Sequence, residues 1–314
     1  MTTRVFIDGA AGTTGLEIRD RLKDRAEFEL ITLDDPQRKD EAARREALHE
    51  ADVAILCLPD DAAREAVALA EGSDTRIIDA SSAHRNMYGW TYGFPELVPF
   101  DTWRCGRAMI AEAQFVANPG CYPTGFLALM QPLILGGLLP LETRYSVNAV
   151  SGYSGGGRSL IARFEDQRDI AFRTYSLAMG HKHLPEMHCY ARLDWAPVFA
   201  PSVIPAYRGM IVEVPISHTD SAMLPSIEEM HRALRTIYAA SKVIQVHDLD
   251  DVPNELVLYS DAAPWDGMEL YVTGDRQQAR LIARLDNLGK GASGAAIQNL
   301  NIMCGLPETT GLRL

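Results

Sequence analysis

Apolar runs alternate with charged stretches through the first third of the chain. The apolar runs, which predict buried strands, span residues 4–8, 28–33, 52–59 and 76–80. The stretches between them have helical patterning and span residues 16–23, 40–49 and 60–70. Strands that alternate with helices through short turns are typical of a doubly wound parallel sheet, so we expect an α/β domain here.

The pattern changes after residue 143, where apolar and polar positions begin to alternate. The alternating runs, which predict half-buried strands, span residues 146–150, 210–216, 242–246 and 269–275. A surface helix is predicted at residues 226–240. These elements predict a second domain of α+β type, with an antiparallel or mixed sheet and helices on one face.

The last predicted helix spans residues 294–303 and has an apolar face. That face is formed by Ala295, Ala296, Leu300 and Met303. We expect it to pack back onto the first domain. The predicted domains are therefore 1–120 plus 290–314, and 121–289.

The chain of 314 residues is acidic, with 42 aspartate and glutamate residues against 30 lysine and arginine residues, a formal net charge of −12. This charge argues against nucleic-acid and anionic-membrane partners, whereas a small anionic substrate can still bind where arginines cluster. Hydrophobic content of 47% is ordinary for soluble domains. The longest apolar candidate, at 125–139, is interrupted by polar residues, proline and glycines, so no membrane span is predicted.

The cysteines are odd in number and widely spaced along the chain. They stand at positions 57, 105, 121, 189 and 304. No two have CxxC or zinc-knuckle spacing, so we expect free thiols in a reducing compartment, the cytoplasm.

Cys121 lies in the segment NPGCYPTG, residues 118–125. The Pro-Gly pair before it predicts a turn, and the proline two residues after it fits the first turn of a helix that we expect to begin near Thr124. A thiol at a helix N-terminus faces unpaired N–H groups and the positive end of the helix dipole, which both favour the thiolate. The context therefore indicates a nucleophile rather than an inert core cysteine such as Cys57.

A glycine-rich loop follows the first predicted strand and opens the first predicted helix. Its glycines are Gly9, Gly12 and Gly15. Glycines in this position permit a tight turn and let the backbone approach a pyrophosphate. Their spacing differs from the commonest dinucleotide fingerprint, but the strand and helix around them favour a ligand over a bare turn.

Acidic and basic residues both follow the second predicted strand, as Asp34-Asp35 and Arg38-Lys39. An acid at this point usually binds the ribose hydroxyls of NAD, whereas a nearby cation binds the 2′-phosphate of NADP. The residues alone therefore leave the choice between the two cofactors open.

Residues 180–186 read GHKHLPE. In an extended segment His181 and His183 lie on the same side, and a histidine near a cysteine can act as general base and then as general acid. Glu186 can orient one of them. A metal site built on these histidines is disfavoured, because further ligands are not obviously supplied and a metal would capture the thiolate.

Three further segments carry candidate binding chemistry. Residues 151–158, SGYSGGGR, are rich in N–H groups and suit an anion or a carbonyl oxygen. Residues 79–85, DASSAHR, follow the fourth strand at the sheet edge where ligands bind, so Arg85 is a candidate for a substrate phosphate or carboxylate. The small residues of 286–294, DNLGKGASG, suit close backbone approach to a flat ligand such as nicotinamide.

Together these segments resemble the N-acetyl-gamma-glutamyl-phosphate reductase family of arginine biosynthesis, in its shorter form, within the aspartate-semialdehyde dehydrogenase-like superfamily. The resemblance runs in order through residues 9–15, 79–85, 93–97, 118–125, 151–158, 180–186 and 286–301. It implies a Rossmann-type dinucleotide-binding domain, a second α+β catalytic and dimerisation domain, and a homo-oligomer, either a dimer or a tetramer.

The resemblance also implies residue roles. The implied catalytic residues are Cys121, as the nucleophile, with His181, His183 and Glu186. The implied substrate contacts are Arg85, Ser154 and Gly155. The implied NADP contacts are Gly9, Gly12, Thr13, Thr14, Gly15, Arg38, Ser81, Asn287 and Lys290. No metal is implied.

The implied reaction is the NADPH-dependent reduction of N-acetyl-gamma-glutamyl phosphate through a thioester on Cys121. Three alternatives remain: reduction of another acyl phosphate, a cysteine acyltransferase or hydrolase without hydride transfer, and a cofactor-binding regulatory protein. The glycine-rich loop argues against the hydrolase, and Cys121 together with the histidine motif argues against the regulatory protein.

Overall fold

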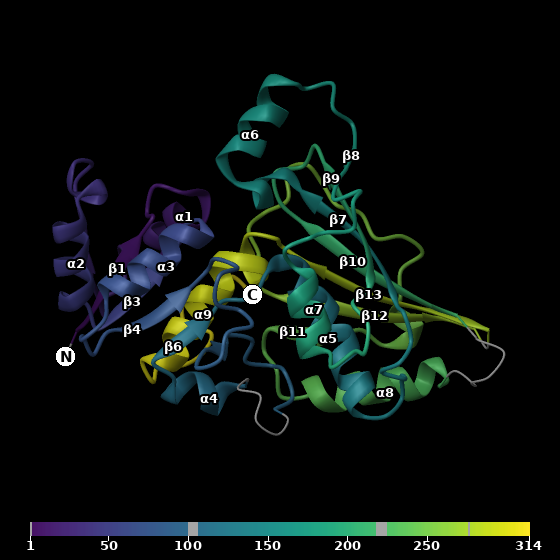
Figure 1. The fold of residues 1–314 in the computed structure, drawn as a ribbon. Coiled ribbons are helices and arrows are strands. Elements are labelled where there is room, and N and C mark those ends of the chain that lie inside the picture. Colours follow the sequence, from purple (N-terminus) through teal and green to yellow (C-terminus); the bar gives the residue numbers. More distant parts are fainter. Residues whose placement is uncertain (1, 100–105, 218–224, 276) are drawn as a thin grey trace. The chain divides into compact units, whose positions relative to one another are not determined.

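The computed structural model describes residues 2–99, 106–217, 225–275 and 277–314, and Figure 1 shows its ribbon. Cys105 lies outside the described residues. Two units form. The first contains Met1–Pro95, Pro99–Pro119 and Ala292–Leu312, and the second contains Glu96–Val98, Gly120–Gly291 and Arg313–Leu314.

The first unit is built on a parallel sheet with the strand order β2-β1-β3-β4-β6-β5. Its strands are β1 (Thr3–Asp8), β2 (Phe28–Ile31), β3 (Val53–Leu56), β4 (Arg76–Asp79), β5 (Thr91–Tyr92) and β6 (Phe115–Ala117). Its helices are α1 (Thr13–Leu22), η1 (Gln37–Lys39), α2 (Glu41–Glu50), α3 (Asp60–Leu69), α4 (Arg107–Glu112) and α9 (Gly294–Met303). The predicted parallel α/β sheet is confirmed.

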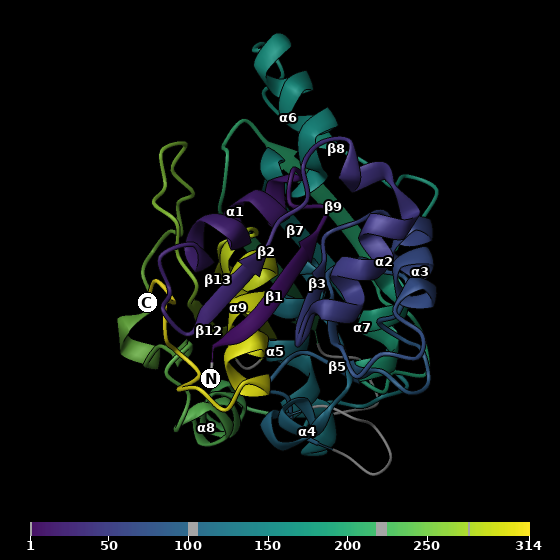
Figure 2. The ribbon, with the colours of Figure 1, turned by 90° about the vertical axis from the view of Figure 1, so that its left-hand side faces the viewer.

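Both faces of this sheet are covered, because successive side chains of a strand point to opposite faces. Val5 and Ile7 of β1 share one apolar cluster with residues of α1 and α9. Phe6, between them, belongs to a second cluster with residues of α2 and α3. Figure 2 shows these two pairs of helices on opposite sides of β1. Burial on both faces explains why the strands are continuous apolar runs in the sequence.

The second unit is built on a seven-stranded sheet with the order β11-β12-β13-β10-β7-β9-β8. Its strands are β7 (Ser146–Gly152), β8 (Arg173–Thr174), β9 (Val198–Ile204), β10 (Met210–Ser217), β11 (Ile244–Val246), β12 (Met268–Gly274) and β13 (Gln278–Leu285). Its helices are α5 (Cys121–Leu135), η2 (Tyr153–Gly156), α6 (Gly157–Asp166), α7 (Leu184–Tyr190), α8 (Ile227–Tyr238) and η3 (Leu249–Asp251). A further helical turn, η4 (Gly289–Ser293), precedes α9.

The sheet is mixed, since β11 pairs with β12 and β7 with β9 in parallel, whereas the other pairs are antiparallel. Helix α5 packs on it where Gly125 lies against Val212 of β10 and Ala283 of β13. Helices α7 and α8 in turn pack against α5. The predicted mixed sheet is confirmed, although the sequence analysis did not identify β8, β9 or β13.

None of the helices in the described part of the chain combines the length and the apolar character needed to cross a membrane.

Candidate active site and dinucleotide pocket

The glycine-rich loop of the first unit joins β1 to α1 at the carboxyl end of the parallel strands. Gly9 has φ +84°, and a Cβ there would overlap the carbonyl oxygen of Cys57, the residue after β3. Only glycine therefore fits at this position. Helix α1 begins at Thr13 without a side-chain cap on its first N–H groups. Uncapped N–H groups at a helix N-terminus suit a phosphate.

A cavity of about 220 Å³ adjoins this loop. Among the described residues that line it are Gly9 and Ala10 of the loop, Leu33 after β2, and two arginines, Arg19 and Arg38. The cavity is lined by residues of β1 and β2 and by Leu58, which follows β3. The strand order reverses between β1 and β3, and dinucleotides bind at this point in sheets of this kind. Its glycine loop and two guanidinium groups fit the adenosine half of a dinucleotide, including one that carries an extra phosphate.

Two basic residues, Arg38 and Lys39, are expected to bind that phosphate, and the structure places them differently. Arg38 lines the cavity, where its Nε donates to Leu33 O over 3.1 Å and its Nη1 pairs with Asp35 at 2.8 Å. Lys39 is not among the lining residues described. The sequence analysis missed Arg19, because one arginine within a charged helix gives no signal of its own.

The segment after β4 folds around a buried carboxylate. Asp79 is fully buried and accepts hydrogen bonds from the Ser81 hydroxyl and from His84 Nδ1, both at 2.6 Å. Arg85, also buried, donates to the carbonyl oxygens of Asn118 and Ala80 over 2.9 and 3.0 Å. Ser81 and Arg85 therefore have internal partners, and their roles toward cofactor and substrate stay predictions.

Cys121 is the first residue of α5, three residues earlier than the helix start expected from the sequence. The Thr124 N–H and hydroxyl both donate to Gly120 O. These bonds form the first helical turn from residues 120–124, so the helix already includes Cys121. Gly120 supplies no side-chain cap. Its N–H instead donates to the buried carboxylate of Glu186 over 3.0 Å. Glu186 thus fixes the turn that presents the half-buried Cys121.

A second segment lies directly against Cys121. A Cβ added to Gly291 would be 2.8 Å from the Cβ of Cys121. The preceding residue, Lys290, forms a 2.8 Å ion pair with Glu96, and both side chains are at most 2% exposed. The ammonium of Lys290 is therefore occupied by Glu96, and the proposed contact of Lys290 with a cofactor stays a prediction.

The two histidines lie close to the residue after the nucleophile. Their ring centroids are 4.8 Å apart, and each lies 5.8 Å from the ring of Tyr122. The segment is not extended, because residues 181–184 form a turn and His183 is the N-cap of α7. The turn nevertheless brings the two rings together.

Hydrogen bonds identify the tautomer of His181. Its Nδ1 accepts from the main-chain N–H of His183 over 3.1 Å, so in the neutral ring the proton is on Nε2. Nε2 then donates to the Tyr175 hydroxyl at 3.2 Å, and that hydroxyl lies 3.3 Å from the hydroxyl of Tyr122. Burial, with a smaller contribution from Lys182, lowers the pKa of His181 to about 4. His181 is therefore a neutral hydrogen-bond donor near neutral pH.

Tyr175 is a component of the site that sequence reasoning missed. Burial raises its pKa to about 12 and raises the pKa of Tyr122 well above its usual value, so both phenols keep their protons. A tyrosine six residues before His181 matches no spacing rule, and only the fold brings it there.

The predicted substrate turn and the predicted cofactor loop contact each other within the second unit. Asn287 donates from Nδ2 to the Ser154 hydroxyl over 2.9 Å, and both residues are 1% exposed. Gly155 is close by, since a Cβ there would be 3.3 Å from the same Nδ2. The structure therefore places these three residues together.

Among the described cysteines, three have raised pKa values. Burial raises the pKa of Cys57 to about 12 and that of Cys189 to about 11, and it also raises the pKa of Cys304. Thiols with raised pKa values are poor nucleophiles at neutral pH. Within the described ranges no group of three or more histidine, cysteine or acidic side chains is arranged to hold a metal ion.

Two family models match the chain. The model described as "Semialdehyde dehydrogenase, NAD binding domain" matches residues 4–102, and "Semialdehyde dehydrogenase, dimerisation domain" matches residues 121–287. A protein of Trichormus variabilis named N-acetyl-gamma-glutamyl-phosphate reductase is 48% identical over 98% of this chain and 99% of its own. A protein of Brucella ovis with the same name is 48% identical over 97% of this chain and 100% of its own.

Solved structures with similar folds are far less similar in sequence. Aspartate semialdehyde dehydrogenase II of Vibrio cholerae superposes with a TM-score of 0.71 at 16% identity, over 97% of this chain and 99% of its own. Aspartate semialdehyde dehydrogenase with NADP from Candida albicans gives a TM-score of 0.66 at 14% identity, again over 97% and 99% of the two chains. These two likenesses show the fold.

Proposed function

Because the chain belongs to the N-acetyl-gamma-glutamyl-phosphate reductase family, we propose that it catalyses the NADPH-dependent reduction of N-acetyl-gamma-glutamyl phosphate in arginine biosynthesis. The products are N-acetyl-glutamate 5-semialdehyde and phosphate. The observation that supports this best is Cys121 at the N-terminus of α5, in a turn held by Glu186, with two histidine rings around the next residue, Tyr122.

In the first step the Cys121 thiolate attacks the acyl carbon of the acyl phosphate. A carbon–sulfur bond forms, the bond from carbon to the phosphate oxygen breaks, and phosphate leaves with the electron pair. The N-terminus of α5 favours the thiolate, and N–H groups there stabilise the negative charge that develops on the carbonyl oxygen. The thioester that results divides one difficult reduction into two easier steps.

In the second step the thioester carbon is reduced. The bound nicotinamide supplies the hydride for this step. The oxyanion that forms on the reduced carbon takes a proton from an acid, which gives the thiohemiacetal on Cys121. The same group, now a base, removes that proton as the carbonyl re-forms and the carbon–sulfur bond breaks, which releases the aldehyde and the thiolate. We assign the proton transfer to His183, because His181 is held as a neutral donor by His183 N and Tyr175.

We infer that the cofactor is NADP rather than NAD. The residues that would hold it are the loop Gly9, Gly12, Thr13, Thr14 and Gly15, with Arg38 and Arg19 around the 2′-phosphate. A ribose hydroxyl is usually bound by an acidic side chain, whereas a 2′-phosphate is bound by arginine. Two guanidinium groups at one cavity therefore support the phosphorylated cofactor. Ser81, Asn287 and Lys290 remain proposed cofactor contacts, and Arg85, Ser154 and Gly155 remain proposed substrate contacts.

We also infer that the enzyme is a homo-oligomer, either a dimer or a tetramer, that works in the cytoplasm. The match of residues 121–287 to a dimerisation domain supports the assembly, and the widely spaced cysteines are compatible with a reducing compartment.

The proposal is tested by following NADPH absorbance with N-acetyl-gamma-glutamyl phosphate as substrate. The matched control is beta-aspartyl phosphate, the acyl phosphate that an aspartate-semialdehyde dehydrogenase would reduce. Oxidation of NADPH with the first substrate and not with the second is the expected result. Preference for beta-aspartyl phosphate would replace the proposed substrate, and release of phosphate without NADPH oxidation would indicate a hydrolase.

A further inference from the structure

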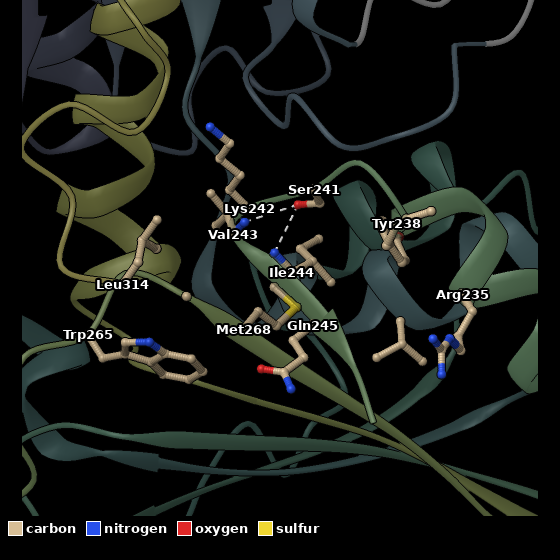
Figure 3. Close-up of a pocket in the computed structure, with 13 residues that line it drawn as sticks. Arg235, Tyr238, Ser241, Lys242, Val243, Ile244, Gln245, Trp265, Met268 and Leu314 are labelled. Carbon is tan, nitrogen blue, oxygen red and sulfur yellow. Dashed lines mark hydrogen bonds between the residues drawn. The ribbon is translucent and has the colours of Figure 1, made fainter. Parts of the chain in front are cut away.

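A separate cavity of about 400 Å³ lies in the second unit, at the edge of the seven-stranded sheet where β11 is the outermost strand. Its walls come from the end of α8, from β11, from the start of β12, and from Trp265. Figure 3 shows Trp265 and Arg235 at opposite ends of this region, with Gln245, Ile244 and Met268 between them. The volume lies in the range of pockets that hold small molecules. None of the residues assigned above to substrate or cofactor lines it.

The side chains that line the cavity carry a net positive charge although the protein is acidic. Arg235 and Lys242 line it, and among the described lining residues none is aspartate or glutamate. Arg235 is paired with Asp248, so Lys242 supplies the excess positive charge. Figure 3 shows its side chain extended away from Gln245, and the flexible lysine stem allows the ammonium to turn toward a bound anion. A local positive charge on a protein of net charge −12 selects an anionic ligand.

One wall of the cavity contacts the segment that lies against Cys121. Asp286 accepts from Trp265 N over 3.3 Å, and a Cβ on Gly289 would overlap the carbonyl oxygen of Trp265. The same segment continues to Gly291, which packs against the Cβ of Cys121. The main chain of Trp265 therefore connects this wall of the cavity to the segment that supports the nucleophile.

A second wall contacts the helix that carries Cys121. The buried Tyr238 donates from its hydroxyl to Ala128 O of α5 over 2.8 Å. Ala128 lies about two helical turns after Cys121 in the same helix. The cavity therefore reaches Cys121 through two independent connections, one through the segment at 286–291 and one through α5.

From these contacts we infer that the cavity is an effector site, which binds a small organic anion with a flat or apolar body and changes the reactivity of Cys121. The flat indole of Trp265 and the side chains of Ile244 and Met268 suit the body of the ligand, and Lys242 suits its anionic group. This inference extends the proposed function, since it adds regulation to the site of Cys121.

Binding is tested with the fluorescent sulfonate 8-anilinonaphthalene-1-sulfonate, with NADP present to occupy the dinucleotide pocket. The neutral N-phenyl-1-naphthylamine, which lacks the sulfonate, is the matched probe. Lys242→Glu is expected to weaken binding of the sulfonate about tenfold, the effect of losing one charge-assisted contact. Lys23→Glu, at an exposed lysine of the first unit, makes the same change of net charge and should leave binding unchanged. Displacement of the sulfonate by benzoate more than by phenyl phosphate, or the reverse, shows whether the site prefers a carboxylate or a phosphate.

Coupling is tested by the rate at which iodoacetamide alkylates Cys121, followed by mass spectrometry with and without the sulfonate. A change of about fivefold in the wild type that is absent in Lys242→Glu is expected. Equal binding by wild type and Lys242→Glu, or equal binding of the neutral probe, would overturn the anion site. Binding without any change at Cys121 would overturn the effector role. Neither measurement requires turnover, so failure of the proposed reductase activity gives a separate result.

Discussion

The main-chain N–H of His183 donates to Nδ1 of His181. One histidine thereby fixes the tautomer of the other, and the second ring nitrogen of His181 points its proton at Tyr175. The two histidines of the motif are therefore unequal in this structure, although they are indistinguishable in the sequence.

We predict that His183→Asn lowers turnover strongly and removes one limb of the pH profile, because that limb reports the ionisation of the acid–base group. His181→Asn should act mainly on the Michaelis constant, since a neutral donor contributes binding rather than proton transfer. Tyr175→Phe removes the acceptor of His181 and should resemble a weaker form of the His181 change. Steady-state kinetics across pH measure all three. Near-normal turnover and an unchanged profile in His183→Asn, with both lost in His181→Asn, would reverse the assignment.

Stability should also depend on pH through His181. Its pKa is lowered from 6.5 to about 4 in the folded protein. Between these two values the unfolded chain binds a proton that the folded chain does not, so the free energy of unfolding falls as the pH falls through this window. His181→Gln should make that fall shallower in urea unfolding. His49→Gln removes an exposed histidine as a control, and an equal change in both variants would contradict the prediction.

Cys121→Ser should lose activity by several orders of magnitude and keep cofactor binding, because a serine hydroxyl is a far weaker nucleophile without a dedicated base.

Iodoacetamide should label Cys121 before Cys57 or Cys304, whose pKa values are raised by burial. Substrate should protect Cys121. Mass spectrometry of the labelled peptides measures this, and first labelling at another cysteine with activity intact would remove Cys121 as the nucleophile.

The buried pair of Glu96 and Lys290 gives a prediction about stability. Lys290→Met leaves the Glu96 carboxylate buried without its cation, which should cost about 3–5 kcal/mol in the free energy of unfolding. Glu96→Gln together with Lys290→Met removes both charges and should cost less. Arg280→Ala breaks a pair that is partly exposed and should cost roughly 1 kcal/mol or less. Equal losses for Lys290→Met and Arg280→Ala in urea unfolding would show that the buried pair does not stabilise the fold.

Strands β1 to β4 of the first unit could be predicted from the sequence because both faces of the sheet are buried, so each of these strands is an apolar run. Strands β5 and β6 contain only 2 and 3 residues, which is too short for a recognisable pattern. In the second unit β9 contains Pro201 at its centre, which argues against a strand when only the sequence is known, whereas Pro215 of β10 lies near the end of its alternating run. Strand β13 carries Arg280 and Arg284, whose partners Glu213 and Glu269 lie on the neighbouring strands. Charges that are satisfied across strands cannot be recognised from local patterning.

Some residues of the candidate site could also be predicted from the sequence, whereas others could not. Cys121 and the histidines stand in short segments whose local chemistry is informative. Glu96 and Lys290 are 194 residues apart, and nothing in either segment shows that the two charges form a pair until the fold brings them together. Tyr175 likewise gains its meaning only from the turn that places His181 beside it.

Cofactor choice gives the last prediction. Arg38 and Arg19 line the dinucleotide cavity, and Lys39 is not among the described lining residues. Arg38→Ala and Arg19→Ala should each weaken NADP more than NAD, by roughly 1.5–3 kcal/mol for each charge-assisted contact to the 2′-phosphate that is lost. Lys39→Ala, one residue from Arg38 and equal in charge, is the matched control and should change neither affinity. Calorimetric titration of each variant with both cofactors measures the difference.

A larger loss of NADP affinity in Lys39→Ala than in either arginine variant would move the phosphate contact to Lys39. Equal weakening of NADP and NAD in the arginine variants would show that another residue binds the phosphate.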